Sequence, residues 1–153
     1  MLGLSIVVPC FNEEPGLAEL VRRCCESASS AVGDSFELIL VDDGSSDRTW
    51  DVITSQIAGH RNIVAIKLSR NYGHQIALTA GLSAVRGKVV FVIDADLQDP
   101  PELLNDMLGK MKESGADVVY GQRRTRAGET WFKTFAAKLF YRILERSTDV
   151  SIP

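Results

Sequence analysis

Residues 89–98 (VVFVIDADLQ) join an apolar run of strand length to a polar turn that carries two carboxylates. Residues 89–93 are apolar at every position, which is the pattern of a strand covered on both faces of a parallel sheet. Similar runs of strand length occur at residues 4–8, 36–41 and 63–68. These four runs predict four strands of one sheet.

Helical patterns lie between the predicted strands. Pro15 opens the first helix, because a proline in the first helical turn removes an N–H that has no partner there. Asp47 is placed to cap the next helix, and further helices are expected over residues 74–85 and 100–112, followed by a fifth strand over 117–120. This alternation predicts an α/β fold: a Rossmann-like, mostly parallel sheet with helices on both faces.

The composition is that of one ordinary globular domain, with 153 residues of which 45% are hydrophobic and 24% charged. No apolar run approaches the roughly 18 residues that span a membrane. The N-terminus has neither the basic region nor the cleavage site of a signal peptide. The three cysteines have no C-x-x-C spacing, so they fit a reducing compartment better than a disulfide framework or a zinc site.

Charge is distributed unevenly along the chain. Residues 1–121 hold 10 basic against 17 acidic side chains, whereas residues 122–153 hold 7 against 3. A basic C-terminal end on an acidic body indicates an anionic partner for that end, such as phosphate or a membrane surface. The pI near 5.4 argues against general nucleic-acid binding.

Polar clusters follow the predicted strands at the point where each strand ends. They lie at residues 12–14, 42–43, 70–71 and 94–98. Because the carboxyl ends of parallel strands meet at one edge of the sheet, these four segments are expected to converge on a ligand site.

Asp94 and Asp96 are the strongest candidates for chemistry in that site. Two close carboxylates repel each other unless one takes up a proton or a cation lies between them, and Ala95 leaves space for such a cation. Gln98 adds a neutral carbonyl oxygen, so the set suits Mg²⁺ or Mn²⁺ completed by water and substrate phosphates. The alternative is that Asp94 only terminates the strand.

Asp42 and Asp43 precede Gly44 and allow two interpretations. Aspartates in this position often only form a turn with their own backbone. Beside a metal site, one of them could instead bind a nucleobase or a ribose hydroxyl. Of the two histidines, His60 is expected at the surface, and His74 in a structural or capping role or, alternatively, facing the site.

Four ordered motifs carry a family resemblance: residues 8–14 (VPCFNEE), 41–47 (VDDGSSD), 70–73 (RNYG) and 94–102 (DADLQDPPE). Together they are similar to the family 2 inverting glycosyltransferases of the GT-A fold. Within that family the chain most resembles the polyprenyl-phosphate glycosyltransferases, the group that includes dolichol-phosphate mannose synthase and bactoprenol glucosyltransferases. The resemblance covers about residues 3–125.

The resemblance implies roles for residues of this chain. The implied nucleotide-binding set is Pro9, Phe11, Glu13, Val41, Asp43, Asp94, Ala95 and Arg123. Asp94, Asp96 and Gln98 would hold Mg²⁺ or Mn²⁺, and Asp94 and Asp96 would be the catalytic carboxylates. The implied reaction is the transfer, with inversion, of a sugar from a UDP or GDP sugar to undecaprenyl or dolichyl phosphate.

Residues 1–125 are therefore interpreted as a nucleotide-sugar-binding core, and residues 126–153 as a basic amphipathic helical segment that leads to a missing C-terminal part. Residues 129–146 combine Trp and Phe with Lys and Arg at helical spacing, which suits either a membrane interface or packing against the rest of the protein. The resemblance implies a place at the cytoplasmic face of a membrane, within a membrane-anchored parent protein.

Three other classes of protein compete with this interpretation. Because the family's acceptor-site segment would follow Pro153, the chain could be a nucleotide-sugar-binding module without catalysis. A receiver-type phosphoacceptor domain would carry its acidic pair after the first strand, whereas the aspartate pairs of this chain follow the second and fourth strands. A Rossmann dehydrogenase is disfavoured because no G-x-G-x-x-G follows the first strand.

Overall fold

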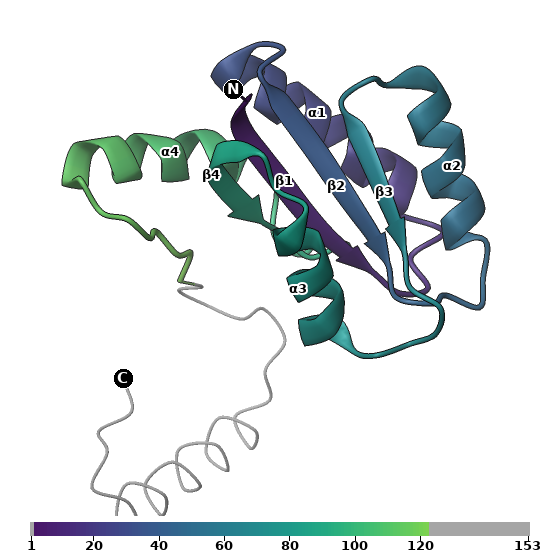
Figure 1. Ribbon diagram of the computed structural model, residues 1–153. Helices are drawn as coiled ribbons and strands as arrows, with labels where there is room; N and C mark the ends of the chain where they lie inside the picture. The colour runs from purple at the N-terminus through teal and green to yellow at the C-terminus, as the bar shows by residue number, and fades with distance from the viewer. Residues whose placement is uncertain (1, 123–153) are drawn as a thin grey trace, which may run out of the picture. The chain divides into compact units, whose positions relative to one another are not determined.

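The computed structural model describes residues 2–122. The chain divides into two compact units, Met1–Val119 and Tyr120–Pro153, and the fold below is that of the first. Its strands and helices alternate (Figure 1) in the order β1 Leu2–Cys10, α1 Leu17–Val32, β2 Phe36–Asp42, α2 Thr49–Gly59, β3 Ile63–Lys67, α3 His74–Ser83, β4 Gly87–Val92 and α4 Leu103–Ser114. The four predicted strands and the helices between them are confirmed.

The strands form one parallel sheet in the order β3-β2-β1-β4. The chain leaves β1 toward β2 on one side, whereas β4 pairs with β1 on the other side. Loops that leave neighbouring strands in opposite directions open a crevice at the carboxyl edge of the sheet, which is where ligands bind in folds of this class. The topology therefore places a crevice beyond the ends of β1 and β4.

Helices cover both faces of the sheet, as predicted. Side chains of α1, α2 and α4 pack with alternate residues of the strands into one core, which includes Leu20, Ile53 and Leu104. On the other face, Ala77 of α3 packs with Val7 and other strand residues into a second core. The helices thereby fix the directions in which the loops at the carboxyl edge leave the sheet.

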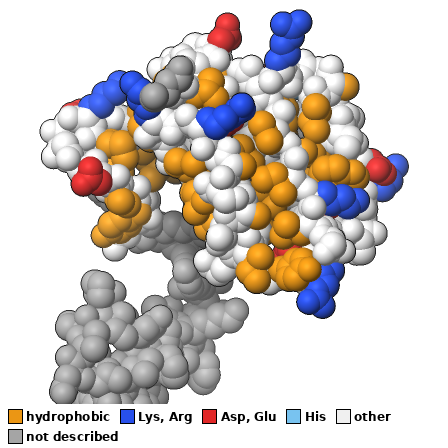
Figure 2. Space-filling view, in the orientation of Figure 1, with side chains coloured by type: hydrophobic (Ala, Val, Ile, Leu, Met, Phe, Trp, Pro, Cys, Tyr) orange, Lys and Arg blue, Asp and Glu red, His pale blue; other side chains and the backbone are white. Residues whose placement is uncertain are grey.

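Two predictions about the C-terminal side of the sheet are wrong. Val90 and Val92 are 37% and 43% exposed, so the second face of β4 is not covered within residues 2–122. Residues 117–120 form no strand, and Val118 is 76% exposed. Figure 2 shows hydrophobic side chains gathered at the surface over the region of the strands.

Both differences have the same physical reason. In the described part of the chain β4 pairs only with β1, and the buried side chains under α3 come from β1 and β2. A segment such as 117–120 has strand-like residues but gains stability as a strand only when a neighbour satisfies its backbone groups. Residues 117–120 have the residue types of a strand, but within residues 2–122 no neighbouring strand pairs with them.

No helix within residues 2–122 has the length and apolarity needed to cross a membrane. An amphipathic helix was predicted over residues 129–146, and a domain boundary at residue 125. Both positions lie outside the described residues, so both stay predictions.

Candidate functional site

A cavity of about 260 Å³ lies at the carboxyl edge of the sheet, in the crevice beyond β1 and β4. Its lining comes from the loops after β1, β2, β3 and β4 and from the start of α3. Seven of the residues predicted for the site line it together: Pro9, Phe11, Glu13, Asp43, Asp94, Ala95 and Asp96. The expected convergence of separate segments on one edge of the sheet is therefore what the structure shows.

Three of the predicted site residues are not in the lining. Val41 is fully buried in the core beneath α3. Gln98 is exposed in the loop after β4, and its side chain does not line the cavity. Arg123 lies outside the described residues.

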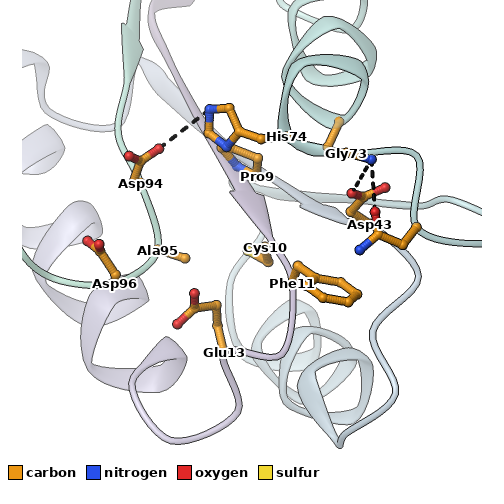
Figure 3. A pocket seen from close by; sticks show the side chains of 12 residues that line it. Pro9, Cys10, Phe11, Glu13, Asp43, Gly73, His74, Asp94, Ala95 and Asp96 are labelled. Atoms are coloured by element: carbon orange, nitrogen blue, oxygen red, sulfur yellow. Dashed lines mark hydrogen bonds and ion pairs between the residues drawn. The ribbon is translucent and has the colours of Figure 1, made fainter. Parts of the chain in front are cut away.

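Three carboxylates and the ring of Phe11 lie on different sides of the cavity. Figure 3 shows Asp94, Asp96 and Glu13 around Ala95 on one side, and Asp43 with the ring of Phe11 on the other. Phe11 is 43% exposed, so one surface of its ring is open to a ligand. The cavity thus offers a polar, acidic side and a side with an aromatic ring.

Asp94 and Asp96 lie in the loop that follows β4 and both side chains are exposed. The amide nitrogen of Gln98 donates to Oδ1 of Asp96 at 2.9 Å, a local turn that holds the Asp96 side chain. Leu97, between Asp96 and Gln98, has φ 57°, and its side chain packs against the core. That packing helps to hold a backbone conformation that is unfavourable for leucine.

The pKa of Glu13 indicates the sign of the electrostatic potential in the cavity. Burial raises the pKa of this carboxyl above its usual value, and the negative charges of Asp96, Asp47 and Asp94 raise it further. A group whose charged form is disfavoured in this way indicates a site with excess negative potential, which a cation would relieve.

Asp43 holds the start of α3 against the end of β2. Its Oδ1 accepts a hydrogen bond from the amide of Tyr72 at 2.8 Å, and its Oδ2 accepts one from the amide of Gly73 at 2.9 Å. Asp42 is fully buried, and its Oδ1 accepts from the amide of Ser45 at 3.1 Å. The turn interpretation therefore describes Asp42, whereas Asp43 lines the cavity and also positions the loop before α3.

The two aspartates after β4 fit a divalent cation that a ligand completes. Within residues 2–122, no three His, Cys, Asp or Glu side chains come close enough to hold a metal ion by themselves. Mg²⁺ and Mn²⁺ are commonly held by one or two carboxylates together with substrate phosphates and water. Exposed Asp94 and Asp96 beside an acidic cavity match this kind of site, and it requires no third protein ligand.

Several lining residues were missed or undecided in the sequence. His74, the first residue of α3, lines the cavity, and its Nε2 lies 3.8 Å from Oδ1 of Asp94. Asn71 and Gly73 join it from the preceding loop. Asn71 belongs to the polar cluster at residues 70–71 that was expected at this edge, Gly73 belongs to the motif at residues 70–73, and the sequence left the role of His74 open. Cys10 is a buried thiol in the floor, and burial raises its pKa, which makes it unreactive.

Two solved structures have a similar fold. The mannosyltransferase PcManGT from Pyrobaculum calidifontis, in complex with GDP-Man and Mn²⁺, is 23% identical, with a TM-score of 0.62 over 71% of this chain and 32% of that one. S. aureus TarS 1-349 in complex with UDP-GlcNAc is also 23% identical, with a TM-score of 0.61 over 86% of this chain and 38% of that one. At this level of identity they show a shared GT-A fold.

Sequence comparison identifies the family. A Synechocystis sp. protein named as an uncharacterized glycosyltransferase, sll0501, is 45% identical over 152 residues, which are 99% of this chain and 47% of the relative. The chain therefore spans about half the length of this relative. The profile described as glycosyl transferase family 2 matches residues 5–153, nearly the whole sequence. The chain belongs to glycosyl transferase family 2.

Proposed function

We propose that this chain is the donor-binding part of an inverting glycosyltransferase, which moves a sugar from a nucleoside-diphosphate sugar to a polyprenyl phosphate with the help of Mg²⁺ or Mn²⁺. The observation that carries the proposal is the cavity in which Phe11, Asp43 and the Asp94–Asp96 pair meet. Similar folds that bind GDP-Man with Mn²⁺ or UDP-GlcNAc support the class of donor.

The two sides of the cavity match the two ends of such a donor. The exposed ring of Phe11 can pack against a nucleobase or ribose, and Asp43 lies beside it to accept hydrogen bonds. The acidic side cannot take a diphosphate directly, because like charges repel. A divalent cation held by Asp94 and Asp96 would neutralise the diphosphate and stabilise it as the leaving group.

The reaction needs little help from a protein base. A phosphate monoester loses its second proton with a pKa near ~6, so the acceptor is already an oxyanion at neutral pH. Its oxygen would attack the anomeric carbon while the bond from that carbon to the donor phosphate breaks, which inverts the configuration and releases the nucleoside diphosphate. The main task of this chain would be to hold the donor so that the face opposite the leaving group is open.

The acceptor and the membrane are proposed from the sequence. Residues 129–146 carry the basic amphipathic pattern, which suits a segment lying at an anionic lipid surface near a lipid-linked acceptor. The cytoplasmic face of a membrane is proposed because the family resemblance of the sequence implies it. Replacing Trp131 and Phe135 by serine should reduce co-sedimentation with anionic liposomes, and unchanged sedimentation would contradict this part of the proposal.

A transfer assay tests the reaction. The protein is incubated with labelled UDP or GDP sugars, Mn²⁺ and undecaprenyl phosphate, and label is measured in the lipid extract. The proposal predicts metal-dependent label in the lipid and, from an α-linked donor, a β-linked product. Retention of the α-configuration would contradict the inverting mechanism.

The second candidate is a nucleotide-sugar-binding module without transfer. The observation that favours it is that the chain spans about half the length of its relative. This candidate predicts that the donor binds with metal and that no label reaches the lipid. Transfer by the 153-residue chain would exclude it.

A further inference from the structure

The loop after β1 is tied to the loop after β2 by hydrogen bonds that run in both directions. Three successive amides of the first loop donate to side-chain oxygens of the second loop and of Thr49, the first residue of α2. Asn12 N donates to Ser45 Oγ at 3.0 Å, Glu13 N to Thr49 Oγ1 at 2.8 Å, and Glu14 N to Asp47 Oδ2 at 3.2 Å.

The second loop donates back to the first. Oδ1 of Asn12 accepts from the amides of Ser46 and Asp47 at 2.9 and 3.4 Å. Asn12 has φ 57°, a left-handed conformation that is uncommon for a residue other than glycine. These bonds hold Asn12 in this conformation, and its neighbours Phe11 and Glu13 both line the cavity.

Thr49 is the centre of this connection and is fully buried. Its hydroxyl donates to Oδ1 of Asp47 at 2.5 Å, which directs the oxygen lone pairs toward the amide of Glu13. The amide of Thr49 also donates to the same oxygen of Asp47, at 2.9 Å. A hydroxyl whose proton is committed in this way is a fixed acceptor, so the position of the Glu13 backbone is set by Asp47 through Thr49.

We infer that Thr49 and Asp47 are positioning residues for the donor site: they hold the Glu13 backbone so that its carboxylate stays on the acidic side of the cavity. Figure 3 shows the Glu13 side chain directed toward Asp96 and Ala95. This inference rests on the proposed function for the identity of the ligand. Neither residue lines the cavity, so each acts through Glu13.

The chain offers closely matched variants for the test. Thr49→Val keeps the shape and removes the hydroxyl, whereas Thr49→Ser keeps the hydroxyl. Thr54→Val is the control on the same helix, because the exposed Thr54 hydroxyl bonds only to the helix carbonyls of Trp50 and Asp51. Asp47→Asn replaces one of the two acceptor oxygens by a donor, so the side chain can no longer accept from both Thr49 and the amide of Glu14. This variant carries the test if Thr49→Val does not fold.

The first measurement is the affinity for UDP and GDP with Mn²⁺, by calorimetry on the whole chain. We expect Thr49→Val and Asp47→Asn to weaken binding roughly tenfold, Thr49→Ser to restore it to within about twofold, and Thr54→Val to leave it unchanged. Unchanged affinity in both Thr49→Val and Asp47→Asn would overturn the inference, as would equal loss in Thr49→Ser and Thr49→Val.

The second measurement separates the positioning role of Thr49 from the proposed binding of a nucleotide. Amide hydrogen exchange at Glu13 in the free protein should be at least roughly tenfold faster in Thr49→Val than in the wild type, and unchanged in Thr54→Val. If the wild type binds neither nucleotide, the proposed function fails, and exchange at Glu13 still decides whether Thr49 holds this amide. Unchanged exchange would overturn the positioning role whatever the ligand.

Discussion

Gly44 lies where the loop after β2 passes against the loop before α3. Its φ is 67°, and a Cβ at this position would lie 2.3 Å from the carbonyl carbon of Arg70 and 2.6 Å from the amide nitrogen of Asn71. Both neighbouring atoms belong to the backbone, so they cannot move aside without moving the loop. This single residue therefore fixes how closely the two loops approach at the cavity.

We expect Gly44→Ala to lower the free energy of unfolding by about 1–3 kcal/mol, because it adds backbone strain and a collision with Arg70. The control is Gly59→Ala at the end of α2, where an added Cβ meets nothing within 4 Å. That substitution should change stability by less than about 1 kcal/mol. Denaturant unfolding measures both, and equal stabilities would contradict the account of Gly44.

At the scale of elements, α3 lies close to the sheet because of a second glycine. A Cβ on Gly81 would lie 2.4 Å from Cγ1 of Val7 and 3.1 Å from Cγ2 of Val41. The first turn of the same helix carries His74 into the cavity. The distance between α3 and the sheet thus affects the site as well as the core.

Gly81→Ala should cost about 1–3 kcal/mol, because overpacking pushes α3 away from Val7 and Val41. Gly109→Ala in α4 is the matched control, since nothing lies within 4 Å of its added Cβ, and it should stabilise the protein by about 0.5–1 kcal/mol. Thermal unfolding of the two variants gives the comparison. A Gly81→Ala protein as stable as Gly109→Ala would show that the helix tolerates a larger separation.

The elements themselves were predictable where the pattern is local. Each predicted run at residues 4–8, 36–41 and 63–68 matches its strand to within a few residues, since apolar runs between turn signals depend on nearby residues only. The strand over 117–120 was predicted from the same signal and is absent. Strand pairing depends on a distant partner, and a single local pattern does not contain that information.

The site was predictable in its location and less so in its detail. Parallel topology alone placed the polar clusters at one edge, and the cavity lies there. Val41 lies two residues before Asp43, within β2. Because Gly81 lets α3 pack closely over it, Val41 is buried in the core and does not line the cavity. Likewise, the bond between Thr49 and Glu13 joins residues far apart in the sequence, so its existence depends on how two loops meet.

At the scale of the whole molecule, Glu37 connects β1 and β2 to the start of β4. It is almost fully buried, and its carboxylate accepts hydrogen bonds from the Ser5 hydroxyl at 2.6 Å and from the amide and guanidinium of Arg86 at 2.6–2.8 Å. Burial raises the pKa of Glu37, but the hydrogen bonds from Ser5 and Arg86 outweigh burial, so the pKa is lowered from its ordinary value of 4.5.

The pH dependence of stability follows from this direction. Because the folded pKa is below the unfolded one, the Glu37 charge stabilises the protein above about pH 4.5, and this contribution is lost as the pH falls through the folded pKa. We expect Glu37→Gln to cost about 1–3 kcal/mol at pH 7, with the difference from wild type shrinking in acid.

The control for Glu37→Gln is Glu26→Gln, which breaks an exposed ion pair with Arg22 on α1 and should cost less than about 0.5 kcal/mol. Urea unfolding at several pH values measures both variants. A Glu37→Gln deficit that is constant from pH 7 into acid would contradict the role of its charge.

The most direct test of the whole account is the binding of UDP and GDP, each with and without Mn²⁺, to the wild type and to Asp96→Asn. Asparagine keeps an oxygen that can accept the amide of Gln98 and removes the charge, so it tests the metal site without opening the turn. We expect that one nucleotide binds only with Mn²⁺ and that Asp96→Asn weakens this binding at least roughly tenfold. Binding that is indifferent to Mn²⁺ and to Asp96→Asn, or no binding of either nucleotide, would contradict it.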